Sequence, residues 1–242
     1  MTGRGRSFGR IADDYDRVRP GYPPDALRSV VGDLVVDVGA GTGKLTALLA
    51  ASRRRVVAVE PDPTMRTVLA GRVGPGVEVV DGTAEHLPVA SGTASAVVYG
   101  QSWHWADPQA AAAEARRVLV DDGVLLLLWN IPDVTVDWVQ ELNRLAGLPV
   151  GFPDLTPTEL AGFSPGVVER VPWEQTLDAS DLVRLFSTFS RVATREPDDR
   201  DRVLASIRAA LTGCTVVAYP YVCVSVTYRR EPRSRRAERR AR

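Results

Sequence analysis

The chain has 242 residues, of which 45% are hydrophobic and 25% charged, with 30 basic and 30 acidic side chains. These proportions are those of a globular protein, and no apolar run approaches the ~20 residues that cross a bilayer, so we expect a soluble chain rather than a membrane protein. Eight Arg and two Glu lie in residues 229–242, which leaves 22 basic and 28 acidic residues in 1–228; this acidic body disfavours a nucleic-acid partner.

The two ends of the chain and the cysteines point to a cytoplasmic protein. No apolar segment precedes the charged residues at the N-terminus, so no secretory signal is visible. Cys214 and Cys223 are too few for a disulfide framework and lack the neighbours of a zinc site, so we expect reduced cysteines and no metal. The Arg-rich residues 229–242 are typical of a disordered extension, to which we assign no role.

The first half of the chain alternates between strand and helix patterns. In chain order, apolar periodicity predicts helices at 11–19 and 25–31, a strand at 34–38, a helix at 43–51, a strand at 56–60, a helix at 63–72, strands at 77–80 and 96–100, a helix at 108–119 and a strand at 123–129. This alternation indicates a doubly wound parallel sheet. Ligands bind such sheets at the carboxyl ends of the strands, which is where residues 39–43 fall.

The pattern after residue 129 is looser. It predicts a helix at 134–145, a strand within 167–177, helices at 180–186 and 200–211, and a strand region at 216–228 that Pro220 interrupts. We therefore expect one domain over 1–228, with 131–228 completing the sheet and adding an insert that faces the substrate.

The stretch "VVDVGAGTGKLT" (Val35–Thr46) places a glycine-rich bend after the first strand. A phosphate loop aligned on Gly43 would need glycine at Val38 and a hydroxyl at Leu45, and a nicotinamide fingerprint would need glycine at Lys44. Neither pattern fits. The spacing G-x-G-x-G instead favours a loop that passes close beneath a ligand and offers its backbone groups to it.

Three further segments follow the next strands. Glu60 ends the second strand, where a carboxylate can accept hydrogen bonds from the two hydroxyls of a ribose, although an exposed acidic strand end is the alternative. "DGTAEHLP" follows the third strand, where a polar turn can lie beside an adenine, and "YGQSWHW" closes the fourth.

Together these segments resemble the class I S-adenosylmethionine-dependent methyltransferases. The likeness covers roughly residues 37–130, through "DVGAGTG", "VAVEPDPTM", "DGTAEHLP" and "RVLVDDGVLLLLW". "ADDYDRVRPGYP" and "QSWHW" are similar to the small-molecule subgroup, methyltransferase type 11 or trans-aconitate methyltransferase-like. The resemblance implies a Rossmann-like, doubly wound, mostly parallel seven-stranded α/β sheet with helices on both faces, a cofactor-binding core at 33–130 and an N-terminal helical lid at 1–32.

The same resemblance implies which residues hold the cofactor, S-adenosyl-L-methionine. Asp37, Gly39 and Gly41 would surround its methionine part, with Gly43 completing the turn. Glu60 would hold the ribose beside Pro61 to Met65, and Thr83, Ala84 and Glu85 would lie by the adenine. Gln101 would sit near the sulfonium, and Tyr15 and Arg19 of the lid would meet the carboxylate. The alternative for Arg19 is a surface arginine beside a proline turn.

The acceptor side is less specific. His104 stands between Trp103 and Trp105, and an imidazole with a reference pKa of ~6.5 suits proton transfer. It acts as a general base, lines the pocket wall or has a purely structural role. Trp103, Trp129 and Asn130 are the candidate acceptor-binding residues, and His86 is expected to be structural.

The sequence thus predicts methyl transfer from S-adenosylmethionine to an O or N atom of a small molecule, a carboxylate or hydroxyl. Two other classes stay open: a non-catalytic protein with the same fold, and an NAD-dependent oxidoreductase, which the glycine spacing disfavours. Nucleic-acid methylation is a weaker third, because "QSWHW" stands where an Asn-Pro-Pro-Tyr-type motif would be. Neither the acceptor nor the oligomeric state can be derived from the sequence.

Overall fold

The computed structural model describes residues 16–232, which divide into two compact units. Unit 1 comprises 16–21, 131–154 and 172–222, and unit 2 comprises 22–130, 155–171 and 223–232. Most of the predicted helix at 11–19 therefore lies outside the described residues, and only 16–18 are seen as helix. No helix among the described residues is long and apolar enough to cross a membrane.

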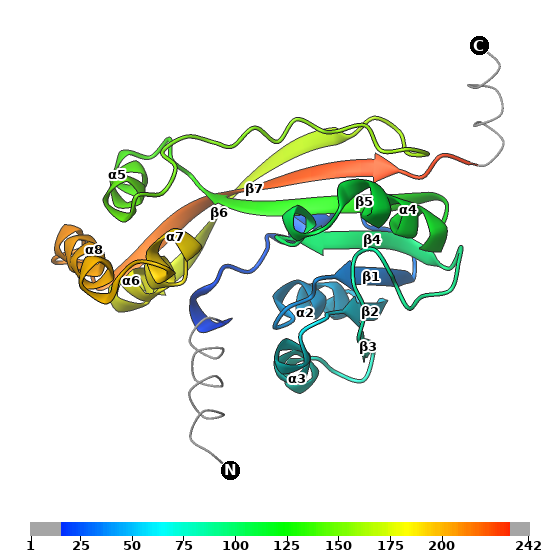
Figure 1. Ribbon diagram of the computed structural model, residues 1–242, viewed down its shortest axis with the longest axis horizontal. Coiled ribbons are helices and arrows are strands. Elements are labelled where there is room, and N and C mark those ends of the chain that lie inside the picture. The colour runs from blue at the N-terminus through cyan, green and yellow to red at the C-terminus, as the bar shows by residue number, and fades with distance from the viewer. Residues whose placement is uncertain (1–15, 233–242) are drawn as a thin grey trace. The chain divides into compact units, whose positions relative to one another are not determined.

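A seven-stranded sheet of order β3-β2-β1-β4-β5-β7-β6 confirms the expected Rossmann-like α/β architecture (Figure 1). Its strands are β1 (Leu34–Val38), β2 (Arg55–Val59), β3 (Val77–Val80), β4 (Ala94–Gly100), β5 (Leu119–Pro132), β6 (Val167–Asp178) and β7 (Val216–Arg229). The pairs β3–β2, β2–β1, β1–β4 and β4–β5 are all parallel. Backbone bonds from Arg230 N to Gly123 O and from Asp133 N to Pro220 O show that β7 runs antiparallel to β5.

Helices and short 3-10 turns connect these strands. In unit 2 they are η1 (Pro24–Leu27), α2 (Lys44–Ala51), α3 (Pro63–Arg72), η2 (Trp103–Trp105) and α4 (Pro108–Val118). In unit 1 they are α5 (Asp137–Ala146), α6 (Ala179–Ser187), α7 (Ser190–Ala193) and α8 (Pro197–Ala210). Both α3 and α4 begin at an Asp-Pro pair, where the aspartate accepts two backbone N–H bonds and proline fills the first helical position.

The pleat of β2 shows that helices cover both faces of the unit 2 sheet. Val57 and Val59 pack in one buried cluster with the alanines of α4, whereas Ala58 packs with Leu69 of α3. Because successive side chains of a strand point to opposite faces, α4 and α3 lie on opposite sides of the sheet. This arrangement is the double winding that the alternating sequence pattern predicted.

Several boundaries differ from the sequence-based expectation. The helix expected at 25–31 is only the short turn η1, and β5 extends from Leu119 to Pro132. Pro220 does not interrupt β7, because its carbonyl still accepts the bond from Asp133 N. Proline removes a donor from a ladder but leaves the acceptor.

The first two residues of the predicted disordered extension belong to the folded part of the chain. Arg229 ends β7, and Arg230 is only 6% exposed although both were assigned to the disordered extension. The guanidinium of Arg230 donates to Leu119 O at 2.8 Å and pairs with Asp121 at 2.7 Å. Arg230 is therefore part of the folded structure, and residues 233–242 of the predicted extension lie outside the described residues.

We expect Arg230→Ala to lower the free energy of unfolding by about 1–3 kcal/mol, because it leaves the buried Leu119 carbonyl without its charged donor. Arg229→Ala is the matched control, since Arg229 is exposed and its charge is the same. Urea unfolding of both variants measures the difference. Equal stabilities would contradict a structural role for Arg230.

Candidate active site

The carboxyl ends of four parallel strands bring the predicted site residues to one edge of unit 2. Gly39 directly follows β1, Glu60 follows β2, Asp81 follows β3 and Gln101 follows β4. The order of these strands can be followed in Figure 1. The strand order reverses at β1, which is the switch point where doubly wound sheets bind ligands.

The glycine bend leaves open space at Gly41. Gly39, Gly41 and Gly43 all have positive φ, a conformation that costs glycine little. A Cβ at Gly43 would lie 2.4 Å from Leu69 Cδ1, so a larger residue there would require the Leu69 side chain to shift. A Cβ at Gly41 would meet nothing within 4 Å, so the loop presents bare backbone to open space there.

Glu60 joins the bend to the loop after β2. Its Oε2 accepts from Gly41 N at 2.8 Å, and its Oε1 accepts from Asp62 N at 3.0 Å. The side chain is only 7% exposed, so the carboxylate is held by these bonds rather than free in solvent. Each oxygen keeps acceptor capacity, because an ionised carboxylate has about four lone-pair sites.

Asp37 is a second buried acid in this site. It lies on β1 with 1% exposure and accepts a hydrogen bond of 2.6 Å from Thr46 Oγ1 of α2. Burial raises the pKa of Asp37 to about 7, and the nearby charge of Glu60 adds to this rise while the Thr46 bond opposes it. Asp37 therefore changes its protonation near neutral pH.

Arg66 is a site residue that the sequence reasoning missed. From the second turn of α3 its Nη1 donates to Glu60 O at 2.7 Å and Pro61 O at 2.8 Å, and pairs with Asp81 Oδ1 at 2.9 Å. One guanidinium thus ties the end of β2 to the end of β3. Its position on the helix after the acidic strand end was the only available signal, and many surface arginines share it.

The turn after β3 is closed by its own backbone. Thr83 N donates to His86 O and His86 N donates to Thr83 O. Glu85 Oε1 accepts from Asp107 N at 3.0 Å, so this side chain links the turn to the start of α4. Ala84 packs against the core.

Among the remaining residues predicted near the ribose, Pro61 is exposed and Met65 is half-buried in the first turn of α3.

The end of β4 is held by side chains that cross to its neighbours. Gln101 has φ +57°, its N donates to Leu128 O, and its Nε2 donates to Asn130 O at 2.9 Å. Ser102 Oγ donates to Val38 O at 2.6 Å, a contact that the sequence did not signal. The predicted residues Gln101 and Asn130 are thereby brought together, through the backbone of Asn130.

The aromatic residues of the site divide into core and surface. Trp103 lies edge-on to the buried Tyr99 with ring centroids 4.8 Å apart, and Trp129 packs against the same cluster. His104 is exposed, with its ring tilted against Trp105, and partial burial lowers its pKa. Trp105 is 82% exposed. His104 is therefore accessible and neutral at neutral pH, as a proton acceptor must be.

Arg19, one of the two residues predicted to act from the lid, belongs to unit 1. Arg19 Nη2 donates to Thr188 O at 2.7 Å, and its guanidinium lies 5.0 Å above the ring of Phe189. Tyr15 lies outside the described residues. A role for Arg19 at the cofactor carboxylate thus stays a prediction, and its contacts with Thr188 and Phe189 are within unit 1.

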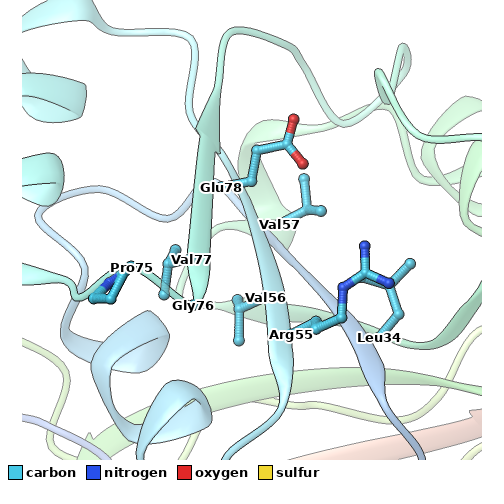
Figure 2. Close-up of a pocket in the computed structure, with 8 residues that line it drawn as sticks. All are labelled: Leu34, Arg55, Val56, Val57, Pro75, Gly76, Val77 and Glu78. Carbon is cyan, nitrogen blue, oxygen red and sulfur yellow. The ribbon is translucent and has the colours of Figure 1, made fainter.

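Figure 2 shows a hollow at the other end of the strands. It is lined by Leu34, Arg55 and Val77, which begin β1, β2 and β3, together with neighbouring residues up to Glu78. Parallel sheets bind ligands at the carboxyl ends of their strands, and these residues lie at the amino ends. We therefore place the candidate site at the glycine bend and not in this hollow.

The sheet order defines a Rossmann-like α/β protein, with the glycine bend and the two buried acids at the carboxyl ends of its parallel strands. Comparison with known proteins agrees. A family model described as a methyltransferase domain matches residues 36–127. The chain is 37% identical over 230 residues to an uncharacterised methyltransferase of Mycobacterium tuberculosis, covering 91% of this chain and 94% of that one. It is 30% identical to an uncharacterised methyltransferase of Schizosaccharomyces pombe, covering 84% and 86%.

A solved structure supports the same fold. A protein titled as a type II methyltransferase from Anaeromyxobacter dehalogenans superposes with a TM-score of 0.58 at 22% identity, covering 88% of this chain and 97% of that one. The chain belongs to the methyltransferase family, as a class I S-adenosylmethionine-dependent member. This finding sets aside the NAD-dependent oxidoreductase.

The pKa of Asp37 predicts a pH-dependent stability. Because the folded pKa is raised above the unfolded value, the folded state binds more protons, and Asp37 costs stability as pH rises from about 4 to about 7. Asp37→Asn keeps an acceptor for Thr46 and removes this cost. We expect the variant to gain stability relative to wild type at pH 8 and not at pH 4, measured by urea unfolding. An equal difference at both pH values would contradict the raised pKa.

Proposed function

We propose that the protein transfers a methyl group from S-adenosylmethionine to an O or N atom of a small molecule. A carboxylate or hydroxyl is the acceptor group that we favour. The observation that carries the cofactor part is the pairing of Glu60 with Gly41 N at 2.8 Å beside a loop whose Gly41 borders open space. A ligand can approach the backbone there, and a fixed acid stands ready for two vicinal hydroxyls.

The residues present fit an adenosyl cofactor of this kind. Glu60 would accept from the ribose hydroxyls while keeping its bonds to Gly41 and Asp62, since its oxygens have lone pairs to spare. Asp37 and Glu60 supply negative charge near a cationic ligand. Gly39 and Gly43 would shape the turn beneath the methionine part, and the 83–85 turn would border the adenine.

The cofactor, when bound, supplies a methyl group already activated on a cationic sulfur. The chain therefore has to orient the acceptor and exclude water, which are effects of positioning. Trp103, Trp129 and Asn130 are our candidates for the acceptor side. A carboxylate acceptor needs no base, whereas a hydroxyl or amine has to lose a proton, and His104 is the accessible group that can take it.

Calorimetry and a transfer assay test this proposal. We expect the chain to bind S-adenosylmethionine and S-adenosylhomocysteine and not NAD. Transfer of labelled methyl to a panel of small acids, phenols and amines then measures turnover. Binding without transfer to any acceptor would favour the non-catalytic alternative, and absence of cofactor binding would overturn the proposal.

The carboxylate of Glu60 should govern cofactor affinity. We expect Glu60→Gln to weaken S-adenosylmethionine binding about tenfold or more, because the amide loses charge and turns one donor towards a backbone N–H. Glu78→Gln is the matched control, since Glu78 is exposed on β3 and the change in charge is the same. Titration calorimetry gives both constants. Equal affinities in the two variants would remove Glu60 from the cradle.

His104→Gln separates the two roles of the histidine. We expect turnover with a hydroxyl acceptor to fall about 100-fold, the lower end of the usual contribution of a general base. Turnover with a carboxylate acceptor should not change, because a carboxylate has no proton to lose. Saturating acceptor kinetics measure both. Full turnover with the hydroxyl acceptor would leave His104 only a pocket-lining role.

A further inference from the structure

The hollow in Figure 2 lies at the amino ends of β1, β2 and β3, at the opposite end of these strands from the candidate site. We call it the amino-end hollow. It is lined by Leu34 and by residues 55–57 and 75–78, all of which belong to unit 2. Its volume is about 360 Å³, which falls within the roughly 300–1,000 Å³ of small-molecule sites.

The strand register places one charge of each sign around an apolar floor. Arg55 of β2 pairs with Leu34 of β1, and Glu78 of β3 pairs with Val57, two residues after Arg55. Paired residues on neighbouring strands, and residues two apart on one strand, share a face of the sheet. Figure 2 accordingly shows the side chains of Arg55 and Glu78 with Val57 between them.

The position opposite Arg55 on the next strand carries no side chain. Val56 pairs with Val77, so Gly76 stands opposite Arg55, and Val56 N donates to Gly76 O. A Cβ at Gly76 would meet nothing within 4 Å. The space beside the Arg55 side chain is therefore open rather than filled by packing.

Neither charged group of the hollow is compensated by the chain. The side chains of Arg55 and Glu78 are exposed, and neither makes a hydrogen bond or an ion pair with another described residue. The preceding arginine differs, because Arg54 Nη2 donates to Val30 O at 2.8 Å. Opposite charges on neighbouring strands commonly stabilise a sheet by pairing. Here they stay apart and give the hollow a positive and a negative end.

We propose that the amino-end hollow binds a free α-amino acid with an apolar side chain. The carboxylate of the ligand pairs with the guanidinium of Arg55, its ammonium pairs with the carboxylate of Glu78, and its side chain lies over Leu34. A simple acid would satisfy only Arg55 and a simple amine only Glu78, whereas a zwitterion satisfies both. This binding does not rest on the function proposed above.

A titration of the isotope-labelled full chain with leucine, followed through backbone amide chemical shifts, tests the proposal. We expect saturable shifts at residues 34, 55–57 and 76–78, and none at the glycine bend. Isocaproate is leucine without the ammonium, and isoamylamine is leucine without the carboxylate. We expect each to bind about fivefold more weakly than leucine, the upper value for an exposed ion pair.

Arg55→Gln and Glu78→Gln test the two charges separately. In Arg55→Gln, leucine should bind no more tightly than isoamylamine, which has no carboxylate for Arg55. In Glu78→Gln, leucine should bind no more tightly than isocaproate. Because each variant keeps its affinity for one analogue, a loss of charge pairing is distinguished from misfolding. Arg53→Gln is the matched control, since Arg53 is exposed in the turn before β2, and it should bind leucine as wild type does.

Four results would overturn the proposal. They are no saturable shift at millimolar leucine, shifts that lie only outside the hollow, equal affinities for leucine and both analogues, and wild-type leucine affinity in both hollow variants. A parallel titration with S-adenosylmethionine keeps the two proposals apart. Leucine binding without cofactor binding overturns only the proposed function, and cofactor binding without leucine binding overturns only the amino-end site.

Discussion

The bond between Glu60 and the backbone of Gly41 is the constraint on which the candidate site depends. It joins two loops that are 19 residues apart, and it holds an acid in a buried position where a charge has to be compensated. Arg66 supports this arrangement, because its guanidinium donates to the carbonyls of Glu60 and Pro61 and pairs with the carboxylate of Asp81. These bonds thus hold the carboxyl ends of β1, β2 and β3 in fixed positions relative to one another without a ligand.

The sequence was sufficient for the parallel half of the fold because every segment there carries a local signal. Continuous apolar runs mark β1 and β2, and Asp-Pro pairs mark the starts of α3 and α4. The second half was read less well, since its boundaries depend on pairing between distant residues. Pro220 is the clearest case. Its local propensity predicts a break in the strand, but the N–H of Asp133 donates to the Pro220 carbonyl and the strand continues.

The same distinction holds for the site. Glu60 and the glycine bend with Gly41 were predicted from their positions at strand ends, whereas Asp37 was predicted only from the family resemblance. Arg66 and Ser102 could not be found this way, because their roles arise from the direction of one side chain in three dimensions. The hydroxyls of Tyr219 and Tyr221 on β7 could not be found from the sequence either. They are buried without a hydrogen-bond partner among the described residues, whereas alternating tyrosines on a strand predict only core packing.

Gln101, at the end of β4, combines an unfavourable backbone conformation with a side-chain bond to the neighbouring strand β5. Its left-handed backbone costs a residue with a side chain on the order of 1–2 kcal/mol, which glycine would largely avoid. Glycine, however, has no amide to hold the backbone of Asn130. Selection of variants for heat resistance alone would therefore favour glycine at this position, and would remove the link between β4 and β5 at the candidate site in the same step.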